Sequence, residues 1–297
     1  MSRRGIVLFA LMALIWGIPY LLIRIAVKEV EPTVVVFART AIGALILLPI
    51  VALRGDLRTV LRHWRWVAAF AIVEMAIPWV LVASAEQSLP SSTAALLIAG
   101  VPLVGAAMAL ARPHGGESMG RMAILGMLIG LAGVMAIVGV DGGPTDLGAL
   151  GAMAIVVVCY AAGPVILARR LGTITGMGVS AVALAICAVG YAPFAVAQWP
   201  TTQPSRDAIT ALVLLGVVCT AIAFVVFAAL INEIGPVRAT VITYVNPAVA
   251  AVLGVIVLGE TLTIGFLVGF TLVLFGSALA TRPSRPTHPA TAEASPA

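Results

Sequence analysis

The sequence predicts an all-α integral membrane protein in which ten transmembrane helices form two inverted five-helix repeats. Of its 297 residues, 62% are hydrophobic and only 10% are charged, and the mean hydropathy is +1.15. A soluble domain cannot cover that much apolar surface with polar groups. The apolar residues form ten long runs, and the second half of the chain repeats the first. Because each half holds an odd number of spans, the second copy enters the membrane from the opposite side.

Each expected span is long enough for a helix to cross a bilayer, which takes about 20 apolar residues. The runs are continuous and rich in helix-forming residues, unlike the short alternating segments of a membrane β-barrel. In chain order, the spans are expected at residues 5–27, 33–53, 65–86, 90–111, 120–140, 147–168, 176–197, 208–231, 236–258 and 263–281.

The internal repeat defines the expected domains. Residues 83–110 align without a gap with residues 228–255, at a spacing of 145. After two residues are dropped, residues 116–133 fall on residues 259–276. The composition after the last span, rich in Pro, Ala, Ser and Thr, is typical of disorder. We therefore expect a first five-helix repeat over 1–143, an inverted second repeat over 144–281 and a disordered cytoplasmic tail over 282–297.

The distribution of arginine predicts the orientation. Positive residues gather in cytoplasmic loops of membrane proteins, and with both termini cytoplasmic the outer loops hold only Lys28 and Arg206. The basic loops then face anionic inner-leaflet lipid, so the net charge of +5 requires no nucleic-acid partner. The expected location is the cytoplasmic (inner) membrane. The inner side carries Arg3, Arg4, Arg54, Arg58, Arg62, Arg65, Arg112, Arg121, Arg169, Arg170, Arg238, Arg282 and Arg285.

Reactive residues are sparse. Cys159, Cys187 and Cys219 all lie within spans, as buried packing residues do. The three histidines lie in inner loops or the tail, and the sequence holds no nucleophile, acid–base or metal motif. We therefore expect no catalytic residues, no metal, no cofactor and no enzymatic activity. A passive channel is also disfavoured, because neither a filter nor a ring of polar residues is evident.

Several motifs occur in a fixed order along the chain, namely Trp16-Gly17, Arg39, Pro102, Pro247, Gly116-Glu117 and Gly259-Glu260, each Gly-Glu pair being followed by a glycine-rich helix. In their order and spacing these motifs resemble the EamA branch of the drug/metabolite transporter (DMT) superfamily. The resemblance covers nearly the whole chain. It implies two inverted five-helix repeats around a central cavity, and export of small metabolites such as amino acids. The first half departs slightly, because its loop before the Gly-Glu pair is longer.

Two prolines at matching positions mark a candidate substrate site. Pro102 in the fourth span aligns with Pro247 in the ninth, and a proline inside a helix frees the carbonyl four residues earlier. Inverted-repeat transporters bind substrate near the midplane, on interrupted helices. The alternative is a structural kink, since prolines are common in membrane helices.

Polar residues surround only the second proline. Thr240, Thr243, Tyr244 and Pro247 share one helix face, and Asn246 lies beside it. The matching face of the fourth span is small and apolar, so the two walls suit a ligand with one polar and one apolar end. Interhelical hydrogen bonding is the alternative explanation.

Charges inside spans point more directly to function, because they normally face a cavity or a partner. Glu74 lies at the middle of the third span, and Arg39 lies on the second, about 6 Å away in depth at the rise of an α-helix. Neighbouring antiparallel helices can bring the two into contact. One hypothesis is a structural ion pair. The other is that Arg39 attracts a substrate carboxylate while Glu74 gates the site or carries a proton.

The first span adds a stripe formed by Trp16, Tyr20 and Arg24, spaced four residues apart. The two aromatic rings suit stacking on a ligand, with plain packing as the alternative. Arg24 is expected near the outer surface, where it and Glu86 are candidates for an outer gate.

Together these features predict a secondary transporter, with a small-molecule substrate and membrane lipid as its partners. We expect an exporter of amino acids or similar metabolites that works by alternating access, with proton coupling left open. Import or exchange of sugar-derived or nucleotide-linked solutes is the alternative. Both a monomer and a homodimer are compatible with the sequence.

Overall fold

The computed structural model describes residues 2–110, 121–139, 146–235, 239 and 241–280. All elements in this part of the chain are helical, as expected. The first half contains α1 (Arg3–Gly17), α2 (Pro19–Ala26), α3 (Pro32–Leu53), α4 (Leu57–Arg62), α5 (Trp64–Phe70), η1 (Ala71–Ala76), α6 (Ile77–Ala85), α7 (Ser91–Ile98), α8 (Val101–Leu110) and α9 (Arg121–Gly139). The second half contains α10 (Leu147–Arg170), α11 (Gly176–Ala197), α12 (Arg206–Gly216), η2 (Val217–Ile222), α13 (Ala223–Ile234), α15 (Ile242–Leu258) and α16 (Ile264–Ala280).

The helices are long and apolar enough for a membrane protein. Seven helical stretches in the described residues have the length and composition to cross a membrane. Three more apolar helices are shorter, at 124–136, 242–258 and 264–280. Each of the ten expected spans overlaps one of these stretches. The expected tail over 282–297 lies outside the described residues.

Helix ends follow local chemistry. Ser2, Asp146 and Ser205 accept hydrogen bonds from the first-turn amides of α1, α10 and α12, as N-cap residues do. Pro19 is the first residue of α2, a position where the missing N–H of proline is tolerated. The first span is interrupted just before it, at Ile18 between α1 and α2. Gly259 ends α15 in the left-handed conformation, at φ 66°.

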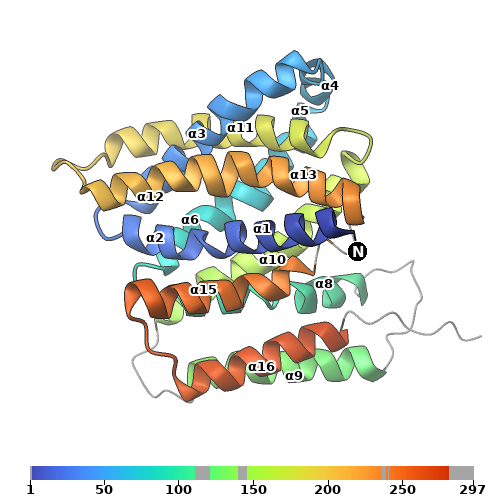
Figure 1. Cartoon of the computed structure of the whole chain (residues 1–297), viewed down its shortest axis with the longest axis vertical. Coiled ribbons are helices and arrows are strands. Elements are labelled where there is room, and N and C mark those ends of the chain that lie inside the picture. Colours follow the sequence, from blue (N-terminus) through green and yellow to red (C-terminus); the bar gives the residue numbers. More distant parts are fainter. Residues whose placement is uncertain (1, 111–120, 140–145, 236–238, 240, 281–297) are drawn as a thin grey trace, which may run out of the picture.

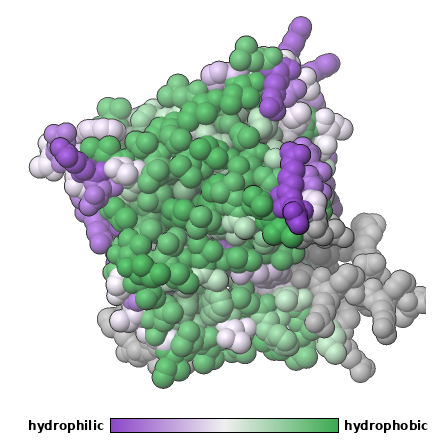
Figure 2. All heavy atoms as spheres, in the orientation of Figure 1, coloured by the Kyte–Doolittle hydropathy of each residue, from purple (hydrophilic) through white to green (hydrophobic). Residues whose placement is uncertain are grey.

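The helices run side by side in a bundle (Figure 1). We call the end that carries Ser2 and the C-terminus of α13 the proximal end. The opposite end, which carries Glu86 and Glu260, is the distal end. Figure 2 shows apolar side chains across the middle of one face and hydrophilic side chains gathered toward the two ends. This distribution fits a bundle whose middle lies in lipid.

Helices from the two halves pack against each other throughout the bundle. The closest pairs are α3 with α11 and α9 with α16. In addition, α1 packs against α13 and α15, while α10 packs against α6 and α8. The α9–α16 contact is tight because Gly126, Gly130 and Gly276 let the two backbones meet. Each half therefore depends on the other for its core.

Candidate functional site

The most unusual side chain in the interior is Arg39 on α3, which is only 8% exposed. Its Nε donates a hydrogen bond to Thr220 Oγ1 of η2 at 2.9 Å. Its guanidinium carbon lies 3.8 Å from the centre of the Trp79 ring of α6, a cation–π geometry. Its terminal nitrogens have no acceptor among the described residues. A guanidinium carries five N–H donors, so most of its donor capacity is free for another group.

Two tyrosines complete the surroundings of this arginine. Tyr20 of α2 and Tyr160 of α10 lie within electrostatic range of Arg39 and of each other. We call Tyr20, Arg39, Trp79, Tyr160 and Thr220 the Arg39 cluster. It draws on both halves of the chain. Trp79, Tyr160 and Thr220 were not predicted from the sequence, although a hydroxyl or an indole within an apolar span was a usable signal.

Glu74 lies in the π-helical segment η1 and does not pair with Arg39. Both residues are described, yet no ion pair forms between them. Glu74 Oε2 has no hydrogen-bond partner in the described structure, and it occupies the space that a side chain at Gly163 of α10 would need. Tyr160 lies within electrostatic range of both charges. The hypothesis of a direct ion pair is therefore not met among the described residues. It assumed regular α-helical geometry, whereas Glu74 lies in a π-helical turn, which changes the direction of its side chains.

Each π-helical segment is held by a helix from the other half. Widened turns leave carbonyls that need donors. Ala76 O of η1 accepts a hydrogen bond from the Tyr191 hydroxyl of α11 at 3.0 Å. In η2, Thr220 accepts from Arg39 while its own hydroxyl donates to Leu215 O at 2.7 Å. Arg39 of the first half therefore contacts the irregular turn η2 of the second half, and Tyr191 of the second half contacts η1 of the first.

The two aligned prolines behave differently. The fourth span is interrupted, since α7 ends at Ile98 and α8 begins at Val101, which places Pro102 in the first turn of α8. The carbonyl of Ala99 at this break accepts from Ser277 Oγ of α16 at 2.9 Å. Pro247 instead lies within the continuous helix α15. The expected interruption is therefore present in the described part of one span only.

The polar face around Pro247 is partly described. Thr240 lies outside the described residues. Thr243 and Tyr244 are half-buried in the first turn of α15. Asn246 is buried, and its Oδ1 has no hydrogen-bond partner within the described structure. A buried amide oxygen without a donor is uncommon in native proteins and suits a ligand.

The stripe expected on the first span is divided between two groups. The ring of Trp16 on α1 packs against the ring of Phe227 of α13 in a tilted arrangement, with ring centres 4.6 Å apart. Tyr20, beyond the bend at Ile18, instead belongs to the Arg39 cluster. Trp16 packs in the same apolar cluster as Val245, the neighbour of Asn246. The structure thus places Trp16 with the α15 residues.

Polar contacts at the distal end join Arg24 to Glu86 and Glu260 to the start of α7. Arg24 and Glu86 do meet, but the guanidinium Nη1 donates to the main-chain carbonyl of Glu86 and not to its carboxylate. Glu260, in the loop after α15, accepts from the Ser91 amide at 2.7 Å and the Ser92 amide at 3.1 Å. These amides begin α7, so Glu260 of the second half caps a helix of the first.

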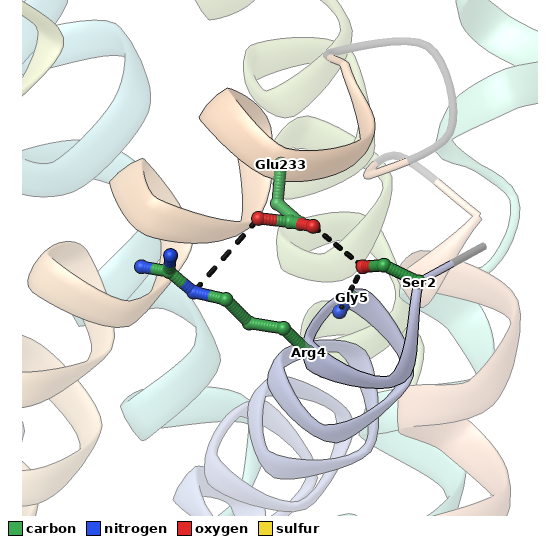
Figure 3. A network of polar contacts seen from close by, with 4 residues as sticks. All are labelled: Ser2, Arg4, Gly5 and Glu233. Atoms are coloured by element: carbon green, nitrogen blue, oxygen red, sulfur yellow. Dashed lines mark hydrogen bonds and ion pairs between the residues drawn. The ribbon is translucent and has the colours of Figure 1, made fainter.

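The proximal end is joined by a smaller network (Figure 3). Glu233 of α13 accepts a hydrogen bond from Ser2 Oγ, and its other oxygen lies 3.8 Å from Arg4 Nε. The side chain of Arg4 is 74% exposed, so its ion pair contributes little to stability. The network nevertheless joins the two halves at this end, as Glu260 does at the other.

No group of three or more His, Cys, Asp or Glu side chains in the described part of the chain is arranged to hold a metal. A shallow surface depression on α4 is lined by Arg58, Thr59, Arg62 and His63. It shares no residue with the Arg39 cluster. Its exposed arginines belong to the basic loops that are predicted from the sequence to face anionic lipid.

Comparison with known proteins places this architecture in a class and a family. The multiple apolar helices define a multi-pass membrane protein. The model of the EamA-like transporter family matches the chain twice, over residues 3–139 and 147–282. The chain therefore belongs to the EamA-like transporter family, within the DMT superfamily, and is a membrane transporter.

Its relatives carry the same class of name. The uncharacterized inner membrane transporter YedA of Escherichia coli (strain K12) is 31% identical over 261 residues, covering 86% of this chain and 83% of YedA. The uncharacterized transporter YvbV of Bacillus subtilis (strain 168) is 25% identical, covering 92% and 90%. A solved crystal structure that is 22% identical has the same fold, with a TM-score of 0.66 and coverage of 95% and 97%.

Proposed function

We propose that the chain is a secondary transporter that exports small metabolites such as amino acids across the cytoplasmic membrane. The observation that carries this proposal is the buried Arg39, whose terminal N–H groups face no described acceptor. A charge buried in a membrane protein without an ionic partner is typical of a substrate or ion pathway. The planar fork of arginine binds a carboxylate with two parallel hydrogen bonds.

The surroundings of Arg39 favour an amphipathic substrate. Trp79 and the two tyrosines offer aromatic surface beside the guanidinium. Pockets of this kind combine apolar walls with few polar groups that orient the ligand. Amino acids carry a carboxylate next to an apolar or polar side chain, and so match both parts. Asn246 on α15, which is not part of the Arg39 cluster, carries a second buried acceptor without a donor among the described residues.

The mechanism we infer is alternating access between two inverted five-helix repeats. The double match of the family model supports a repeat. So does the packing, because α1 lies against α13 and α15 while α10 lies against α6 and α8, the reciprocal spans of the other half. The π-helical segments η1 and η2 lie in the third and eighth spans, at nearly the repeat spacing. Inverted repeats allow one half to move against the other around a central site.

Orientation follows from charge. The proximal end carries most of the arginines, so we place it and both termini in the cytoplasm. The distal end, with Arg24, Glu86 and Glu260, then faces outward. The name of YedA as an inner membrane transporter supports the choice of membrane.

Metabolite profiling of the medium around expressing cells tests export. Wild type, Arg39→Ala, Arg39→Lys and an empty vector are compared at matched membrane levels, with exposed Arg58→Ala as the control. We expect a carboxylate-bearing metabolite to accumulate outside with wild type and Arg58→Ala. Arg39→Ala should reduce export about tenfold or more, since hydrogen bonds to charged groups contribute about 1.5–3 kcal/mol. Arg39→Lys, which keeps charge but loses the fork, should also be impaired. If wild type and vector match outside the cell, export is wrong, and accumulation inside would favour the import or exchange alternative.

A further inference from the structure

The carboxyl group of Glu86 is buried, and no neighbouring group in the described structure donates a hydrogen bond to it. Glu86 ends α6 and is 0% exposed. Both of its carboxylate oxygens are buried without any hydrogen-bond partner in the described part of the chain. An ionised carboxylate that is removed from water and receives no hydrogen bond is strongly disfavoured. In this arrangement the group is far more stable with a proton bound.

In the described part of the chain, the charged and titratable groups around Glu86 come from three other elements. Tyr20 and Arg24 face it from α2, and Arg39 faces it from α3. Glu260 faces it from the loop after α15. The arginines favour the ionised form of Glu86, whereas Glu260 and burial oppose it. The nearer arginine, Arg24, is engaged by the main-chain carbonyl of the same residue.

This geometry also allows the opposite state. Arg24 already contacts the main chain of Glu86, so a rotation of its side chain can bring the guanidinium to the carboxylate. Glu260 is held on the amides of Ser91 and Ser92, which follow Glu86 by a short loop. If the distal end opens, that tie between halves breaks and water reaches Glu86. Hydration and pairing with Arg24 then both stabilise the ionised carboxylate.

We propose that Glu86 is a proton-binding site, protonated while the distal end is closed and deprotonated when it opens. The step transfers one proton from water at the distal end to a carboxylate oxygen, and the reverse step returns it. Closing this end therefore binds a proton and opening releases one. The proposal rests on the alternating access proposed above, and it names the coupling ion of that cycle.

Accessibility of a buried reporter tests the proposal without any substrate. The protein is placed in nanodiscs of phosphatidylethanolamine and phosphatidylglycerol, where both ends face the buffer. Cys159, Cys187 and Cys219 are replaced by alanine, and Ala94→Cys on α7, which is 0% exposed, becomes the reporter. Exposed Gln87→Cys at the same end corrects for the intrinsic pH dependence of maleimide labelling.

The corrected labelling rate of Ala94→Cys should rise several-fold between about pH 5.5 and 8.5, a range outside the ordinary titration of carboxyl groups. Glu86→Gln imitates the protonated acid, so it should remove this dependence and keep labelling slow. Glu86→Asp should retain the dependence. Glu29→Gln is the matched control at the same end, because hydrogen bonds from Ser205 lower the pKa of Glu29 and keep its titration below this range. A flat profile in the parent, or an unchanged one in Glu86→Gln, overturns the proposal.

An infrared difference spectrum gives an independent result. The parent minus Glu86→Gln at neutral pH should contain the C=O stretch of a protonated carboxylic acid. Its absence contradicts the proposal even if the variant labels slowly for other reasons. Because neither measurement needs a transported metabolite, a failed export assay and a failed proton site remain distinguishable.

Discussion

Arg39 Nε and Thr220 Oγ1 form a buried hydrogen bond of 2.9 Å that joins the second span to the eighth. It fixes the guanidinium over Trp79 and leaves the terminal nitrogens without an acceptor among the described residues. The bond also contacts η2, where the helix is already irregular. A residue of one half thus orients the candidate substrate-binding arginine of the other.

Thr220→Val should destabilise the protein by about 1–3 kcal/mol, because a nearly isosteric side chain leaves buried Arg39 Nε without an acceptor. The matched control is Thr40→Val on α3. Thr40 is equally buried, but it donates only to carbonyls of its own helix, those of Val36 and Phe37. Thermal unfolding in detergent measures both. If the two variants have the same midpoint, the Arg39–Thr220 bond does not hold the halves together.

Gly163→Ala should disturb Glu74 directly. A methyl group at position 163 would overlap Glu74 Oε2 and approach its Cδ to 2.9 Å. We expect a loss of about 1–3 kcal/mol from overpacking. Gly151→Ala on the same helix meets nothing within 4 Å and should be neutral or slightly stabilising. Glu74→Ala should reduce the cost of Gly163→Ala in a double-mutant cycle, and strict additivity would show that Glu74 does not fill that space.

The helices and the family were predictable from the sequence. Long apolar runs directly indicate membrane helices, and motifs in a fixed order and spacing indicate the family. It also identified Arg39 and Glu74 as unusual, since charges within apolar runs are visible without a structure. Their contacts were not predictable in the same way. Depth along a helix can be counted from residue numbers, but the direction of a side chain depends on irregular turns such as η1, which α-helical spacing does not show.

The contact between Arg24 and Glu86 illustrates the same limit. Their shared level near the end of the bundle was correctly predicted from the spans. The acceptor is nevertheless a backbone carbonyl, which no side-chain pattern records. Thr220 and Tyr160 were missed because single hydroxyl residues are common in membrane helices and carry little signal until their neighbours are known.

Glu260→Gln should lower the stability of the folded protein by an amount that depends on pH. Partial burial raises the pKa of Glu260, but hydrogen bonds from Ser92 and Ser91 outweigh it and lower the pKa below its ordinary value of 4.5. A carboxyl whose folded-state pKa is lowered stabilises above the unfolded pKa, and that stabilisation is lost as the pH falls through the folded pKa.

At pH 7 the free energy of unfolding of Glu260→Gln should therefore be about 1 kcal/mol below that of wild type, the cost of a lost helix cap, and its unfolding midpoint should be lower. The difference should shrink as the pH falls below 4.5. Glu31→Gln is the control, since Glu31 occupies the N-cap position of α3 without making a cap hydrogen bond. An equal loss at every pH would mean that the charge of Glu260 is irrelevant to the cap.

Gly276→Ala should separate the last helices of the two halves. A methyl group at position 276 would meet backbone atoms of Gly126 and Gly130 on α9, and backbone cannot rotate away as a side chain can. Close approach through small residues is a main source of helix association in lipid, where burial of apolar surface gives no driving force. We expect a lower unfolding midpoint for Gly276→Ala than for Gly190→Ala on α11, which meets nothing within 4 Å. Equal midpoints would show that the α9–α16 contact adapts to a larger residue, and that these glycines are not needed for the halves to pack.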